Sequence, residues 1–124
     1  MANAHRGEVE ITLDKKRILK FNHYAVAELE DALEMDINDI FQNTEIFRRT
    51  KVQIELLRAC LKHEDKTLTY IEVADMLDDV DALYLEERLS LTFERSKYIQ
   101  KLKKVAEEIS SSKKKKTKSG TGKN

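Results

Sequence analysis

The sequence predicts an α+β fold that is mostly α, with an N-terminal two-stranded β-hairpin packed on about five helices and a disordered, lysine-rich C-terminal tail. Apolar and polar residues alternate near the start of the chain, amphipathic helical patterns fill its middle, and the residues from 110 onward include no large apolar side chain. We therefore expect one folded domain over residues 1–109 and a disordered basic tail over residues 110–124.

The hairpin is predicted from two stretches with a period of two residues. Val9, Ile11 and Leu13 alternate with polar residues, and Leu19 and Phe21 repeat the pattern more weakly. Asp14 favours a turn between them, but no glycine is present there to adopt a positive φ, so we expect a connection of three to five residues. Two strands alone are marginally stable in water, so their apolar face must pack on helices.

Five helices follow in the pattern of apolar residues. The first begins after Asn22 as N-cap and extends to about Met35, and a short second helix over 37–41 is capped by Asp36 or Asn38. The other three are expected over about 45–63 with Thr44 as N-cap, over about 70–77, and over about 80–109.

Two of these helices carry more specific expectations. Thr69 and Glu72 have the spacing of a capping box, and the helix that they open is expected to bury Ile71, Ala74 and Leu77. The longest helix has a broad apolar face that Ser96 interrupts. Its members are Leu85, Leu89, Phe93, Ile99, Leu102, Val105 and Ile109.

The formal charge of zero hides a separation of charge along the chain. Six lysines lie in residues 113–124 without any acid. The remainder has 17 basic against 23 acidic side chains, so residues 1–112 carry about −6, and no Lys or Arg lies between Glu72 and Glu87. The body is therefore acidic and the tail basic.

Residue types that carry catalysis are sparse or badly spaced. Cys60 is the only cysteine, and none of the three histidines has a second ligand at helical metal-site spacing other than the carboxylates found throughout the chain. Glycines occur only at positions 7, 120 and 122, which excludes a glycine-rich phosphate loop. We expect no enzyme activity, no cofactor and no metal.

No apolar run approaches the ~20 residues of a membrane span, and the first residues lack the apolar stretch of a signal peptide. The sequence therefore predicts a soluble cytoplasmic protein with no membrane partner.

The lysine run at 113–116 has two interpretations besides a solvated tail. It could contact phosphates, which leaves open a small helical nucleic-acid-associated or regulatory protein that uses this tail, although the acidic body argues against nucleic acid as a partner. Four consecutive lysines also require A-rich codons, where ribosomes can slip into another frame.

The N-terminal segment resembles the tail assembly chaperones of long-tailed bacteriophages, in particular the small chaperone of gene-transfer-agent and related prophage tail clusters. The resemblance lies in Arg6-Gly7-Glu8-Val9, Leu13-Asp14, Leu19-Lys20-Phe21 and Ala27-Glu28-Leu29-Glu30-Asp31-Ala32-Leu33, and covers roughly residues 6–35. Ala25 and Glu28-Leu29-Glu30 match the family's helix core. Lys15 stands where the family has a glycine after Asp14.

The resemblance implies a non-enzymatic chaperone that binds and solubilises the tape measure protein during tail morphogenesis. It also implies a longer frameshifted product, location in the bacterial host cytoplasm and absence from the mature virion. The tape measure protein would be the main partner, the tail tube protein a further one, and self-association is left open. We expect the partner-binding surface to consist of Phe41, Phe47, Ile54, Leu57 and Leu61.

Overall fold

The computed structural model describes the backbone of residues 2–122 and the side chains of residues 2–109. In chain order the elements are η1 (Ala4–Arg6), β1 (Glu8–Thr12), β2 (Lys16–Lys20), α1 (His23–Leu33), α2 (Ile37–Gln42), η2 (Thr44–Arg48), α3 (Thr50–Leu61), α4 (Tyr70–Leu77), α5 (Ala82–Arg95) and α6 (Lys97–Gly122). The predicted fold class, mostly α with an N-terminal hairpin, is confirmed. The described backbone continues α6 to Gly122, and the expected disorder of residues 110–124 stays a prediction.

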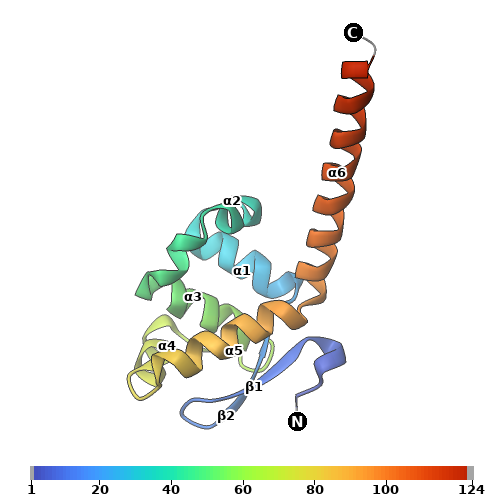
Figure 1. Ribbon diagram of the computed structural model, residues 1–124. Coiled ribbons are helices and arrows are strands. Elements are labelled where there is room, and N and C mark those ends of the chain that lie inside the picture. Colours follow the sequence, from blue (N-terminus) through green and yellow to red (C-terminus); the bar gives the residue numbers. More distant parts are fainter. Residues whose placement is uncertain (1, 123–124) are drawn as a thin grey trace.

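Figure 1 places α3 in the middle of the body, with the hairpin and α5 on one side of it and α1 and α2 on the other. The core is formed where these elements meet, and Val9, Leu19, Leu29 and Leu57 are all fully buried in it. The long helix α6 leaves the end of α5 and points away from the body (Figure 1).

The hairpin has the predicted apolar face and a three-residue connection, Leu13–Lys15. Val9 pairs with Leu19 and Ile11 with Arg17 in an antiparallel register. Asp14 holds the connection without a glycine, because its carboxylate accepts from the amide of Lys15 at 3.0 Å and from the Arg17 guanidinium at 2.7 and 2.9 Å. The same guanidinium keeps the pKa of Asp14 below its usual value.

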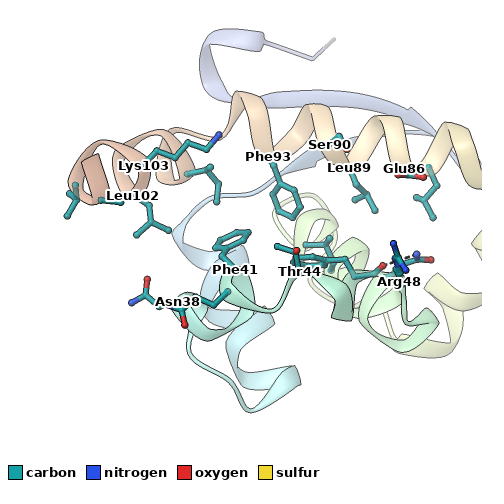
Figure 2. A pocket seen from close by; sticks show the side chains of 18 of the residues that line it. Asn38, Phe41, Thr44, Arg48, Glu86, Leu89, Ser90, Phe93, Leu102 and Lys103 are labelled. Carbon is teal, nitrogen blue, oxygen red and sulfur yellow. Dashed lines mark hydrogen bonds between the residues drawn. The ribbon is translucent and has the colours of Figure 1, made fainter. Parts of the chain in front are cut away.

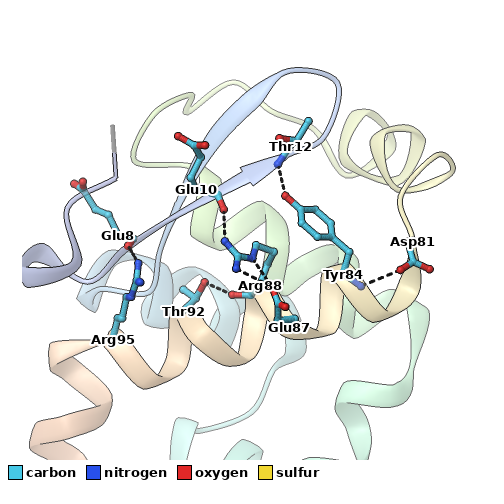
Figure 3. Close-up of polar contacts among 9 residues, drawn as sticks. All are labelled: Glu8, Glu10, Thr12, Asp81, Tyr84, Glu87, Arg88, Thr92 and Arg95. Carbon is cyan, nitrogen blue, oxygen red and sulfur yellow. Dashed lines mark hydrogen bonds and ion pairs between the residues drawn. The ribbon is translucent and has the colours of Figure 1, made fainter.

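Side chains hydrogen-bond to the outward-facing backbone groups on both edges of the hairpin. Those on one edge come from α5, and those on the other come from residues just after α3. On the β1 edge, Tyr84 Oη accepts from the Thr12 amide at 2.9 Å, while Arg88 and Arg95 donate to the carbonyls of Glu10 and Glu8 at 3.1 and 2.9 Å (Figure 3). These three side chains are spaced by four and seven residues along one face of α5, and their backbone partners are every second residue of β1.

The β2 edge is covered from the opposite side, just after the end of α3. The carboxylate of Glu64 accepts from the Ile18 amide at 2.9 Å, and Nε2 of His63 donates to the Ile18 carbonyl at 2.7 Å. The hairpin is therefore clamped between α5 and the end of α3.

Helix α1 begins as predicted, since the Asn22 side chain accepts from the Ala25 amide at 3.0 Å. It ends at Leu33, slightly earlier than expected, because Glu34 adopts a left-handed conformation with φ of 52°. Of the two predicted caps for α2, Asp36 is the one used: it accepts from the Asn38 amide at 3.1 Å.

The prediction of one helix over 45–63 is wrong. Arg49 is extended and separates the 3₁₀ helix η2 from α3, and the Gln53 side chain donates to the Phe47 carbonyl at 2.9 Å across the break. Thr44 lies inside η2 rather than at an N-cap, and the preceding Asn43 makes no side-chain cap.

The capping box that opens α4 is confirmed, with Thr69 and Glu72 bonding each other's amides. The predicted buried face of α4 is partly wrong. Val73 is the fully buried residue, whereas Ile71 is 71% exposed. Two residues correspond to a rotation of about 200° on a helix, so the side that packs on α3 leaves Ile71 in solvent.

The prediction of one continuous helix over 80–109 is also wrong, and Ser96 is the reason. Ser96 is extended, with its Oγ donating to the Phe21 carbonyl at 2.7 Å and accepting from the Ile99 amide at 3.2 Å. Ser96 thus lies at the end of α5, caps α6 with its buried hydroxyl, and connects both helices by a hydrogen bond to Phe21, the residue after β2. Helix α5 itself begins after Asp81, whose carboxylate accepts from the Tyr84 amide.

Replacement of Ser96 by alanine should lower the free energy of unfolding by about 1–3 kcal/mol, because it leaves a buried carbonyl and the first turn of α6 without their partner. Urea denaturation measures this loss. Ser90→Ala is the matched control, since Ser90 is exposed on α5 and should change stability by less than about 0.5 kcal/mol. Equal losses in the two variants would contradict the assigned role of Ser96.

Acid should weaken the link between α1 and α3 through Glu28. Its carboxylate lies 2.9 Å from Lys62 Nζ, and that hydrogen bond holds the pKa of Glu28 below its ordinary value of 4.5. A carboxyl group whose pKa is lower in the folded than in the unfolded state stabilises the fold at any pH above its unfolded-state pKa. This contribution is lost as the pH falls through its folded-state pKa. Glu28→Gln should cost about 0.5–1 kcal/mol at pH 7 and progressively less below pH 4.5. Glu45→Gln, at an exposed position, is the control in pH-dependent urea melts.

Candidate functional site

A groove with a volume of about 1080 Å³ runs between α2 and η2 on one side and α5 and α6 on the other. Figure 2 shows side chains from both sides pointing into it, with Phe41 and Phe93 facing each other across the middle. Its apolar lining consists of Phe41, Phe47, Leu56, Ala82, Leu85, Leu89, Phe93, Ile99, Leu102, Val105, Ala106 and Ile109. The groove therefore presents a largely apolar surface to the outside.

The middle of the groove is built from one aromatic cluster that contains every phenylalanine of the chain. The ring of Phe93 lies 5.8 Å from Phe41, 5.7 Å from Phe47 and 5.0 Å from Phe21 between centroids. The contacts of Phe93 with Phe21 and Phe41 are edge-to-face, and that with Phe47 is tilted, which favours a fixed arrangement of rings. Phe21 is fully buried beneath the other three, which are half-buried and line the groove.

Helix α6 contributes an apolar stripe that continues beyond the body. We define the α6 stripe as Ile99, Leu102, Val105, Ala106 and Ile109, which share one helical face. Burial falls along it: Ile99 is 6% exposed, Leu102 is half-buried, and Val105 and Ile109 are 50% and 52% exposed. The far end of the groove is therefore an aliphatic surface open to solvent.

The structure divides the predicted partner-binding set. Phe41 and Phe47 line the groove, whereas Ile54, Leu57 and Leu61 lie in the core with exposures of 5%, 0% and 0%. These three belong to α3, which is surrounded by α1, α4, β2 and η2 and leaves no apolar face to solvent there. They cannot form a surface for a partner in this conformation.

Sequence reasoning missed the contribution of α5 and α6 to this surface. It found the periodic face that includes Leu89, Phe93, Leu102, Val105 and Ile109 but did not assign it to a partner. The break at Ser96 redirects the second half of that face away from the body, whereas the sequence showed Ser96 only as an interruption of one apolar face.

The groove is mainly apolar, but its rim carries charge of both signs. Arg48 lies on η2, Glu86 on α5 and Lys103 on α6 (Figure 2). A helix with apolar residues on one face and charges on its flanks fits such a surface.

Groups with reactive chemistry lie elsewhere. Cys60 is fully buried, and desolvation raises its pKa well above the usual range, which disfavours the reactive thiolate. The ring of His23 packs edge-on against Tyr98, with centroids 4.8 Å apart. Across the part of the chain that the structure describes, no three His, Cys, Asp or Glu side chains come together in a way that could hold a metal ion. No described helix is both long and apolar enough to cross a membrane.

Comparisons of the chain with protein-family models, with curated proteins and with solved structures found no match.

Replacement of both Val105 and Ile109 by aspartate should at least halve the binding of anilinonaphthalene sulfonate, a dye whose fluorescence rises on apolar surfaces. Both side chains are about half-exposed, so stability should change little. The control is Ile71→Asp on α4, which is more exposed but outside the groove. A dye signal that falls only in the Ile71 variant would contradict the assignment of the groove.

Proposed function

We propose that this chain is a non-enzymatic bacteriophage tail assembly chaperone that binds the tape measure protein and keeps it soluble. The observation that carries the proposal is the apolar groove with its continuation in the α6 stripe, on a small and highly charged body. A tape measure protein is long, helical and partly apolar, and a groove of this kind can cover an apolar helical segment.

The charge of the chain supports this role. Residues 1–112 carry about −6, so chaperone copies bound along one long partner repel each other and the complex stays dispersed. The acidic stretch from Glu72 to Glu87 lies in α4, α5 and their connection, and it contributes Glu86 to the rim of the otherwise largely apolar groove.

The N-terminal resemblance to phage tail chaperones supports the proposal independently of the groove. The matching residues form the hairpin and α1, which hold the helical framework in place. The resemblance further suggests the tail tube protein as a second partner, a longer frameshifted product and action in the host cytoplasm without incorporation into the virion.

The alternative role, in which the lysine-rich tail binds nucleic acid, rests on residues whose side chains lie outside the description. No contact in the structure favours it, and it stays a prediction of the sequence.

Co-expression with the tape measure gene from the same cluster tests the proposal. The soluble fraction of the tape measure protein should rise several-fold with the wild-type chain. Val105→Asp combined with Ile109→Asp should abolish most of that gain, because two charges would enter the groove. Ile71→Asp should retain it.

An unchanged soluble fraction with and without the wild-type chain would overturn the proposed function. If the double aspartate variant still raised the soluble fraction of the tape measure protein, the binding surface would have to lie outside the groove.

A further inference from the structure

The outer half of the α6 stripe is left uncovered by its own chain. Val105 and Ile109 are about half-exposed, although they continue the same face as the buried Ile99. An amphipathic face of this kind is normally covered by another helix. The charges that flank the stripe indicate which helix fits.

Two lysines and two glutamates lie beside the stripe. At about 100° per residue, Lys101 and Glu108 lie on one flank, and Lys103 lies on the other, with Glu107 and Lys104 further round toward the outer face. Lys101 and Lys103 are nearer the start of α6, and the two glutamates are nearer its end. The face is therefore basic in its first half and acidic in its second.

This order of charges complements itself only in an antiparallel arrangement. When two copies of α6 run in opposite directions with Val105 near the twofold axis, Lys103 of each copy comes level with Glu107 of the other. Lys101 and Glu108 then come within about one residue rise, 1.5 Å, of the same level. A parallel arrangement would instead place lysine beside lysine and glutamate beside glutamate, which is repulsive.

We propose that two copies of this chain form a symmetric dimer in which the α6 helices pair antiparallel, so that each covers the exposed α6 side of the groove of the other copy. The interface is isologous, because the same stripe and the same charges serve both copies. Leu102 of one copy then lies within one residue level of Ile109 of the other, so the half-exposed aliphatic side chains cover each other.

This inference goes beyond the proposed function and does not require it, since it concerns the purified chain alone. It gives the groove an occupant in the absence of a foreign partner. Binding of a tape measure segment in the groove would then compete with the dimer.

A pair of charge-reversed variants provides the test. The first carries Lys101→Glu and Lys103→Glu, so all four flanking residues are acidic, and the second carries Glu107→Lys and Glu108→Lys, so all four are basic. Sedimentation equilibrium should find the wild-type chain as a dimer and each variant alone as a monomer, with its dissociation constant raised at least about tenfold by like-charge repulsion. An equimolar mixture of the two variants should recover the dimer mass, because every contact then joins opposite charges.

Lys51→Glu combined with Lys66→Glu is the control for net charge, because both lysines are exposed and lie outside the groove. This variant changes the charge as much as the first one and should remain a dimer. Far-ultraviolet circular dichroism confirms that each variant is folded.

A cysteine at the axis gives a second measurement that needs no change of charge. Val105→Cys should yield a disulfide-linked dimer under mild oxidation, since the native Cys60 is buried, whereas Lys66→Cys should not.

A wild-type chain that stays monomeric at all concentrations would overturn the proposal and leave the groove to a foreign partner. A dimer that persists in both charge-reversed variants would place the interface elsewhere. Neither outcome changes the result expected in the co-expression experiment, because the charge reversals leave the apolar lining of the groove intact.

Discussion

The architecture depends on how the two edges of a small hairpin are satisfied. A two-stranded sheet exposes a row of amides and carbonyls on each side, and alone it is marginal in water. Here Tyr84, Arg88 and Arg95 bond one edge, and His63 and Glu64 bond the other. The helices are thereby fixed in position by directed hydrogen bonds as well as by apolar packing.

This constraint also shapes the groove. Helix α5 is fixed along β1 by three side chains from one of its faces, so its other face, with Leu85, Leu89 and Phe93, is turned toward η2 and α2. Ser96 then sets the direction of α6 through the Phe21 carbonyl. The opening between α2 and α6 follows from these anchors at the hairpin, while Phe93 packs on Phe41 and Phe47 across the middle of the groove.

Much of the fold could be predicted because its signals are local. Strand alternation at Val9 and Ile11, the cap at Asn22 and the capping box at Thr69 depend on residues close in sequence, and the structure confirms each of them. The breaks at Arg49 and Ser96 were not predicted: Ser96 interrupts the apolar face, but the partner that makes it a break is distant in sequence, and the apolar pattern runs on past Arg49. Ser96 bonds a carbonyl 75 residues away.

The candidate site was predicted only in part for the same reason. Phe41 was expected on the short helix over 37–41 and Phe47 on the helix over 45–63, and both line the groove. Ile54, Leu57 and Leu61 have an equally apolar helical pattern, but α3 is covered on several sides. Periodicity reveals that a face is apolar, whereas the arrangement of neighbouring elements decides whether it is inside or outside.

The occupied hairpin edges limit how a partner can be recognised. Many proteins bind an extended peptide by letting it join a sheet as an extra strand, which requires a free row of backbone donors and acceptors. In the described hairpin, side chains of this same molecule already take outward-facing groups at Glu8, Glu10, Thr12 and Ile18. An incoming strand would have to displace those bonds, so recognition by β-augmentation is disfavoured, in keeping with the helical partner proposed for the groove.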